Sequence, residues 1–333
     1  MKALLSKLPG GPQSLVLEDA PVPVPGPGEA LIRVQAVGVN FPDVLIIEDK
    51  YQYRPQRPFS PGGELSGVVE RLGDGCRLTT PGDRVLAMVT YGAMAEKVVV
   101  KESNLIKIPP QMPFDDAAAF LFTFGTSYHA LKDRAQLKAG ETLLILGAAG
   151  GVGMAALQLA KTMGARVVAA VSSAEKAEVC RAMGADEAVI YDPNPAGSDT
   201  RRALTAQFKQ ALGPGGADVV YDAVGGAYAE AALRAIAWAG RYLVVGFATG
   251  EIPQIPLNLA LLKSCDIRGV FYGAWCERFP ELRNIEADEL LRLYAQGAVR
   301  PHIAERFPLH RGSEAIARVA GRKALGKVVI TID

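Results

Sequence analysis

A short run of small residues at 147–153 indicates chemistry more clearly than any other part of this sequence. It reads Gly-Ala-Ala-Gly-Gly-Val-Gly, with an apolar run before it at 143–146 and a helix-forming run after it at 154–161. Small side chains let the backbone approach a pyrophosphate closely, and the amino end of a helix supplies N–H groups and a partial positive charge. We therefore predict a dinucleotide site, with turn contacts from Ala149, Gly150, Gly151 and Val152.

The turn departs from the fingerprint G-x-G-x-x-G, because Ala148 stands at its first position. An ordinary strand-to-helix turn is the alternative interpretation. The surrounding pattern favours a nucleotide domain, since further strands are predicted at 165–171, 187–190, 218–222 and 241–246, with helical segments between them. Alternating strands and helices predict an α/β domain with a doubly wound parallel sheet.

The outer parts of the chain have a different pattern. Strand-like runs at 30–37, 67–72, 84–89 and 95–100 are separated by Pro/Gly turns, and a strand at 267–270, a helix at 287–296 and a strand at 327–332 are predicted near the other end. We predict a β-rich domain built from residues 1–120 and 266–333, with the nucleotide domain, 121–265, inserted between them. A ligand cleft between the two domains is expected, because ligand sites favour such interfaces.

Composition limits the classes of partner. The 333 residues are 49% hydrophobic and 21% charged, and the net charge is +1. This balance indicates a large core and gives no global basic excess for nucleic-acid binding. The four cysteines form no C-x-x-C pair, which suits a reducing cytoplasm, and no apolar run is long enough to span a bilayer. We expect a cytoplasmic protein without nucleic-acid or membrane partners.

The sequence resembles the medium-chain dehydrogenase/reductase superfamily, in its zinc-free quinone oxidoreductase (zeta-crystallin-like) branch. The resemblance covers nearly the whole chain and is carried by the motifs at 38–43, 61–67, 81–85, 148–153, 221–225 and 326–327. It implies a GroES-like catalytic domain, a Rossmann domain that binds NADPH, and a homodimer.

No metal is predicted at the catalytic position. In the zinc-dependent members, a cysteine and a histidine bind the ion at the positions held here by Asn40 and Gly63, neither of which supplies a thiolate or an imidazole. His129 is interpreted as a packing residue, and His302 and His310 as surface or turn residues.

The end of the second strand of the nucleotide domain favours NADPH over NADH. NAD-specific sites place a carboxylate there, whereas this chain has Ser172, Ser173 and Lys176, and Glu175 is interpreted as facing solvent. The resemblance implies that Lys176, Tyr191 and Arg322 bind the 2′-phosphate. Solvated charges are the alternative for Lys176 and Arg322.

The resemblance also assigns the nicotinamide end of the site. The implied positions are Asn40, Thr126, Val152, Val245, Gly246, Phe247 and Phe271. The alternative role of Thr126 is a helix cap.

The predicted reaction is hydride transfer from NADPH to a quinone. The alternative is reduction of α,β-unsaturated carbonyls, acrylates or enoyl thioesters, and a non-catalytic NADPH- or RNA-binding protein is a third hypothesis. Asn40 and Tyr51 are the candidate catalytic donors and Tyr272 a weaker one, while the alternative for Asn40 is to hold its own loop. Related reductases often carry a tyrosine where Leu45 stands, so a site that relies on that tyrosine as its acid is excluded here. Leu45 mildly favours quinones, and a more apolar pocket is the alternative interpretation.

Overall fold

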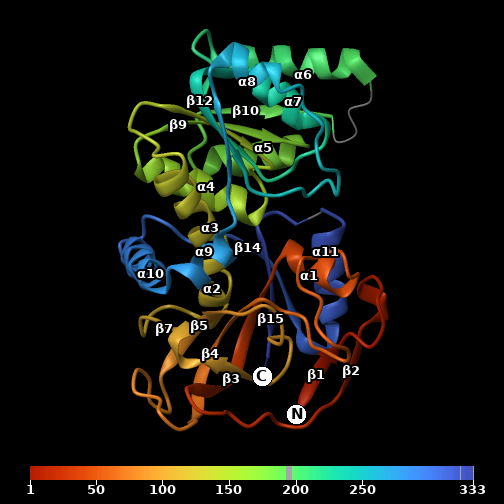
Figure 1. Cartoon of the computed structure of the whole chain (residues 1–333), viewed down its shortest axis with the longest axis vertical. Coiled ribbons are helices and arrows are strands. Elements are labelled where there is room, and N and C mark those ends of the chain that lie inside the picture. Colours follow the sequence, from red (N-terminus) through yellow and green to blue (C-terminus); the bar gives the residue numbers. More distant parts are fainter. Residues whose placement is uncertain (193–196, 323, 333) are drawn as a thin grey trace. The chain divides into compact units, whose positions relative to one another are not determined.

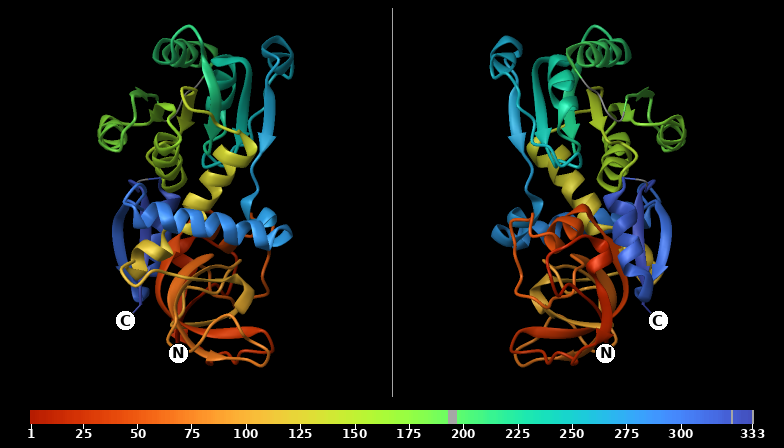
Figure 2. Two further views of the ribbon diagram at one scale, coloured as in Figure 1. Left: turned by 90° about the vertical axis from the view of Figure 1, so that its left-hand side faces the viewer. Right: turned by 90° about the vertical axis from the view of Figure 1, so that its right-hand side faces the viewer.

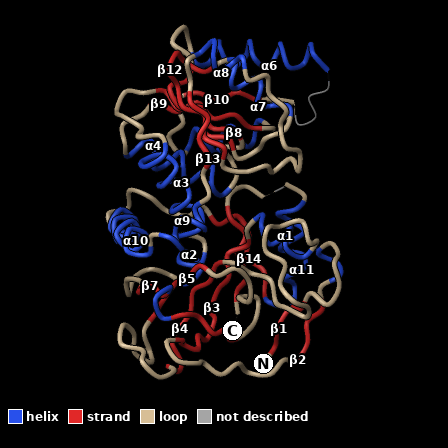
Figure 3. The backbone as a smooth tube through the Cα atoms, viewed as in Figure 1, coloured by secondary structure: helices blue, strands red, loops and turns tan. Residues whose placement is uncertain are grey.

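The computed structural model describes residues 1–192, 197–322 and 324–332. The chain forms two compact units. Unit 1 comprises 1–122, 287–295 and 300–333, and unit 2 comprises 123–286 and 296–299. Figure 1 labels the elements of both, and Figure 3 separates helices, strands and loops.

Unit 1 is the β-rich part of the chain. Its strands are β1 (Lys2–Leu5), β2 (Val16–Asp19), β3 (Glu29–Val39), β4 (Glu64–Leu72), β5 (Arg84–Met88), β6 (Lys97–Lys101), β7 (Leu105–Lys107), β14 (Ile303–Pro308) and β15 (Lys327–Thr331). Its helices are α1 (Phe41–Ile47), α2 (Phe114–Ala118) and α11 (Gly312–Ala320).

The central strand of unit 1 joins the two ends of the chain. The order in the larger sheet is β14-β15-β3-β4-β5-β7, with β6 also paired to β3. The register between β3 and β4 shifts at two bulges, where a strand bends. On its other edge, β3 pairs first with β6 and then with β15. The prediction that the last strand returns to the first domain is confirmed.

Unit 2 contains a parallel six-stranded sheet. Its strands are β8 (Thr142–Leu146), β9 (Arg166–Val171), β10 (Glu187–Ile190), β11 (Ala217–Asp222), β12 (Ile236–Val244) and β13 (Asp266–Gly269). Its helices are α3 (Thr126–Tyr128), α4 (Gly151–Thr162), α5 (Ala174–Ala182), α6 (Gly197–Leu212), α7 (Ala227–Arg234), α8 (Asn258–Lys263) and α9 (Tyr272–Arg278).

The strand order in unit 2 is β10-β9-β8-β11-β12-β13, and helices cover both faces of the sheet (Figure 2). This order reverses direction between β8 and β11, as in doubly wound nucleotide-binding sheets. The inner strands β8, β9 and β11 are almost wholly buried, because both faces of the sheet are covered, and this explains their continuous apolar runs. The predicted fold class, a Rossmann sheet together with a β-rich GroES-like unit, is confirmed.

One predicted domain boundary is wrong. Residues after 265 were expected in the β-rich domain, but β13 pairs with β12 and belongs to unit 2. The division falls inside α10 (Pro280–Ala295), after Glu286. β13 was misassigned because it is short and alternates charged with apolar residues, so its sequence does not look like a buried parallel strand.

Candidate functional site

The small-residue turn connects β8 to α4 as predicted. Gly147 has φ +70°, a backbone conformation that side chains disfavour, and Gly150 is the residue before the first turn of α4. A Cβ atom on Gly153 would lie 2.4 Å from the backbone oxygen of Gly147, so only glycine lets the helix pack this close to the turn. The first N–H groups of α4, from Gly151 and Val152 onward, have no intrahelical partner by geometry and carry the positive end of the helix dipole.

The carboxyl ends of β11 and β12 are tied together by Asp222. Its carboxylate accepts hydrogen bonds from the N–H groups of Val224 and Gly225 at 2.8 and 2.9 Å, and from the Tyr242 hydroxyl at 2.6 Å. Burial raises the pKa of Asp222, and these hydrogen bonds oppose that effect. Asp222 lies in the motif at 221–225, but nothing in the sequence indicates this positioning role.

The predicted nicotinamide residues after β12 lie at this same edge. The N–H groups of Val245 and Gly246 both donate to the backbone oxygen of Asp222, at 2.8 and 3.2 Å. Phe247 follows them directly. Phe271, between β13 and α9, is 49% exposed and therefore has a free apolar face. The carboxyl edge of a doubly wound sheet is where such sheets bind nucleotides.

The predicted ribose-phosphate residues lie after β9. The Ser173 hydroxyl caps α5 by accepting the N–H of Lys176 at 3.3 Å, and the Lys176 ammonium donates to the Ser172 hydroxyl at 3.0 Å. Burial lowers the pKa of Lys176, whereas the charge of Glu175 raises it. Glu175 is exposed in the first turn of α5, as interpreted from the sequence.

The other two predicted phosphate residues lie in different units. Tyr191 follows β10 in unit 2, and its ring centroid is 4.6 Å from that of Tyr228. Arg322 follows α11 in unit 1, is exposed, and has φ +54°. Their joint role at a 2′-phosphate stays a prediction.

Thr126 does not cap a helix. Gly125 before it already has helical backbone angles, and π-helical turns at Leu121–Gly125 and His129–Arg134 continue the helix on both sides. The capping alternative is therefore wrong. The hydroxyl of its neighbour Ser127, a residue that no sequence motif marks, donates to the backbone oxygen of Val152 at 2.9 Å and lies 3.0 Å from the Tyr221 hydroxyl oxygen.

Unit 1 contains a buried polar cluster made of Asn40, Glu64 and Lys327, which are 7%, 1% and 4% exposed. The Lys327 ammonium donates to the Asn40 side-chain oxygen at 2.8 Å and to Glu64 Oε2 at 3.0 Å. The Asn40 amide nitrogen donates to the backbone oxygen of Gly38 and to Glu64 Oε2, both at 3.1 Å. The cluster therefore satisfies its buried charges internally.

These contacts bear on the predicted role of Asn40. Its amide nitrogen already has two acceptors within the protein, an arrangement that matches the loop-holding alternative. Donation to a substrate oxygen would require one of these bonds to be exchanged, and that role stays a prediction.

Asp43 fixes the loop that carries Asn40. Its carboxylate accepts the N–H of Asn40 at 2.7 Å and that of Gly62 at 3.1 Å. Burial raises the pKa of Asp43 to about 6, although these hydrogen bonds and the charge of Lys327 oppose the shift. The sequence contains this residue in the motif at 38–43 but gives no signal of its raised pKa.

The tyrosines proposed as donors differ in environment. Tyr51 is partly buried against the core of unit 1, and burial raises its pKa, so its hydroxyl stays protonated at neutral pH. Tyr272 is buried in unit 2, where its hydroxyl packs so closely on Gly125 that a Cβ there would lie 2.4 Å from it. Tyr51 is therefore the better candidate of the two.

His129 is buried as expected, with its ring centroid 4.5 Å from that of Trp275. It also approaches Asp133 and Glu286. Within the part of the chain that the structure describes, these three form the only group of three or more His, Cys, Asp or Glu residues close enough to share a metal ion. Nothing in the sequence indicates that these two carboxylates lie beside His129.

Comparisons with known proteins agree across the chain. Residues 26–110 match the family described as alcohol dehydrogenase GroES-like domain, and residues 151–287 match that described as zinc-binding dehydrogenase. A protein of Nematostella vectensis named quinone oxidoreductase-like protein 2 homolog is 38% identical over 92% of this chain and 82% of its own. Quinone oxidoreductase of Pseudomonas aeruginosa is 34% identical over 96% of each chain.

Solved structures give the same result. A mycobacterial protein solved in complex with NADPH matches with a TM-score of 0.91 and 31% identity over 99% of each chain. Escherichia coli quinone oxidoreductase, also complexed with NADPH, matches with a TM-score of 0.91 and 26% identity, over 99% of this chain and 100% of its own.

Proposed function

Because the chain belongs to the medium-chain dehydrogenase/reductase superfamily, we propose that it is an NADPH-dependent oxidoreductase that transfers hydride to quinones. Two observations on this chain support the cofactor. The close packing of α4 at Gly153 leaves a backbone cradle at the turn, and the end of β9 presents the Ser172 and Lys176 side chains where NAD-specific sites have an acid. The named relatives support the quinone class.

Different residues of the chain would bind different parts of the cofactor. The turn from Ala149 to Val152 would hold the pyrophosphate, while Lys176, Tyr191 and Arg322 would hold the 2′-phosphate. Bound NADPH supplies the hydride. The loop after β12, fixed by Asp222, would position the nicotinamide through Val245, Gly246 and Phe247.

We propose that this hydride chemistry is independent of zinc, although one matched family is described as zinc-binding. Asn40 stands where the zinc-dependent members carry a cysteine ligand, and its side-chain oxygen is bound by the Lys327 ammonium. The same ammonium binds Glu64, so a fixed positive charge already occupies this cluster. A metal ion placed beside it would be repelled and would find its nearest oxygens in use.

Reduction of activated alkenes is the second candidate, and Tyr51 favours it. Reduction of an enone needs a proton for the product, and Tyr51, partly buried against the core of unit 1, carries a hydroxyl proton at neutral pH. The tyrosine that related reductases often carry as a donor is replaced here by Leu45, which has no hydroxyl group. A variant Tyr51→Phe would lose enone activity and keep quinone activity if Tyr51 is the acid.

The test of the proposed function is a screen of NADPH oxidation with quinones, enones and acryloyl or crotonyl thioesters. We expect quinones to give the highest kcat/KM. NADPH binding with no turnover of any acceptor would leave the non-catalytic hypothesis, and RNA binding that weakens with salt would then support it.

Cofactor choice is tested by Lys176→Ala. Loss of one charge-assisted hydrogen bond, worth about 1.5–3 kcal/mol, would raise the KM for NADPH roughly 10- to 100-fold. The KM for NADH should change little. Lys209→Ala, on the exposed side of α6, is the matched control. An equal effect on both cofactors would contradict the assignment.

The proposal extends to the location, assembly and partners of the protein. We propose a cytoplasmic homodimer that acts on a small molecule and has no nucleic-acid or membrane partner. Among the described residues, no helix has the length and apolar character needed to cross a bilayer.

A further inference from the structure

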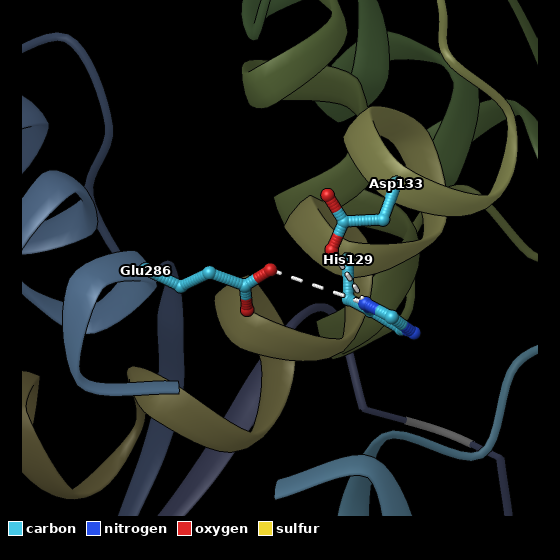
Figure 4. Close-up of side chains that lie close together, drawn as sticks. All are labelled: His129, Asp133 and Glu286. Atoms are coloured by element: carbon cyan, nitrogen blue, oxygen red, sulfur yellow. Dashed lines mark hydrogen bonds and ion pairs between the residues drawn. The ribbon is translucent and has the colours of Figure 1, made fainter. Parts of the chain in front are cut away.

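A histidine and two carboxylates converge inside unit 2 (Figure 4). His129 and Asp133 stand four residues apart on the π-helical turn His129–Arg134, with His129 Nδ1 2.7 Å from Asp133 Oδ2. Glu286, from α10, brings Oε1 to 3.9 Å from the same nitrogen. His129 and Glu286 are only 4% and 6% exposed, so a carboxylate and an imidazole are held together away from water.

We propose that His129, Asp133 and Glu286 form a binding site for one divalent transition-metal ion of the zinc type. Their donor atoms all lie within 4.8 Å of one another. Tetrahedral zinc, with bonds of about 2.0–2.1 Å, spaces its ligands roughly 3.3 Å apart. The observed separations of 2.7 and 3.9 Å lie on either side of that value, so small side-chain rotations would complete the geometry.

The donor set and its surroundings suit such an ion. One imidazole and two carboxylates match the ligand preferences of zinc and its neighbours, and three protein ligands leave one position open. All three residues line a cavity of about 580 Å³, which gives that position access to a water or a ligand. The Trp275 ring, packed on the imidazole, restricts its orientation.

Three cations lie close in sequence to the ligands, and each has a hydrogen-bond acceptor. Lys132 donates to the Tyr128 hydroxyl, Arg134 donates to the backbone oxygen of Gly269 at 3.1 Å, and the buried Arg283 donates to Asn284 Oδ1 at 2.9 and 3.2 Å. The site does not rest on the proposed hydride chemistry, because none of its ligands belongs to the polar cluster of Asn40, Glu64 and Lys327. Its role would be to fasten the helical segment that carries Thr126 to the start of α10.

The experiment is a metal titration of the full-length protein after removal of bound ions with EDTA. Co²⁺ is followed by its visible absorption, which reports a low-coordinate site, and Zn²⁺ by calorimetry. We expect one ion per chain. Affinity should fall by at least about tenfold in His129→Gln and in Glu286→Gln, and should be unchanged in His310→Gln, which alters an exposed histidine.

A second readout separates binding from misfolding. Zn²⁺ should raise the unfolding temperature of the wild type and of His310→Gln, but not that of Asp133→Asn, which changes an exposed side chain and should fold normally. Failure of the wild type to bind, or equal affinity in the wild type and His129→Gln, would overturn the proposal and leave a hydrogen-bonded cluster.

Discussion

Lys327 neutralises the buried polar cluster of unit 1. It donates to Glu64 and Asn40, and all three side chains are shielded from water. A buried carboxylate that loses its partner keeps the full cost of desolvation, whereas removal of both charges can be nearly neutral.

We therefore expect Lys327→Met to lower the free energy of unfolding by about 3–5 kcal/mol, because Glu64 is left unpaired. The double variant Lys327→Met with Glu64→Gln should recover a large part of that loss. Urea unfolding of the wild type, both single variants and the double variant measures the coupling. Additive losses would show that the two charges do not depend on each other.

Asp43 should make the stability of the protein depend on pH. Its pKa in the folded state, about 6, exceeds its ordinary value of 3.8. The folded state therefore binds the proton more tightly than the unfolded state does, and ionisation of Asp43 destabilises the fold. Protonated Asp43 stabilises the folded state fully below pH 3.8, and this stabilisation is lost as the pH rises through about 6. The difference corresponds to about 3 kcal/mol.

The check is a comparison of Asp43→Asn with the wild type by urea unfolding from pH 4 to pH 7. Asparagine does not titrate, so the wild type should lose stability relative to the variant across this range. A constant difference between the two proteins would show that Asp43 does not titrate there.

The sequence predicted the local parts of the site better than the parts assembled by folding. The small-residue turn and the serines after β9 lie within single stretches of chain, so their types and spacing were readable. The contact of Lys327 with Glu64 spans 263 positions, and no local pattern reports it. The same holds for Glu286 beside His129, which sequence analysis could assign only to packing.

At the scale of elements, the junction of β8 and α4 depends on Gly153. A Cβ atom there would meet backbone atoms of Gly147 and Ala148 at 2.4 and 2.7 Å, and a backbone cannot rotate away as a side chain can. We expect Gly153→Ala to displace the amino end of α4 and to weaken NADPH binding at least about tenfold, a loss of about 1.4 kcal/mol.

Calorimetric titration with NADPH measures this effect. Gly215→Ala is the control, because a Cβ at Gly215 would meet nothing within 4 Å. Unchanged affinity in Gly153→Ala would show that the cofactor does not depend on this packing.

Elements were predictable where their pattern was regular. The buried strands of unit 2 are continuous apolar runs, and the turns of unit 1 carry Pro and Gly. β13 was placed in the wrong domain, and β14 was missed because Glu305 and Arg306 interrupt its apolar pattern. Both segments form strands because they pair with neighbouring strands, and their own residues have no clear strand pattern.

At the scale of the whole molecule, exposed apolar side chains of unit 2 favour the proposed homodimer. Trp238 and Leu261 are 73% and 79% exposed. Trp238 belongs to β12, which pairs with the edge strand β13, and Leu261 belongs to α8, which packs beside β12. Large exposed apolar groups gathered on one unit are typical of an interaction surface.

We expect Leu261→Asp to shift the protein toward the monomer, because a charge in an apolar interface is costly. Light scattering coupled to size-exclusion chromatography measures the mass. Leu78→Asp, at a 66% exposed leucine of unit 1, is the control and should leave the mass unchanged. A monomeric wild type would contradict the proposed assembly.

The pairing of β15 with β3 has a consequence for biosynthesis. During synthesis, Asn40 and Glu64 leave the ribosome long before Lys327, the lysine that neutralises the cluster. The first part of the β-rich unit therefore stays incomplete while the nucleotide unit is made. The nucleotide unit can fold first, because all the strands of its sheet come from one continuous stretch of chain. A nascent chain stalled before residue 327 would thus hold a finished Rossmann unit and an unfinished β-rich one.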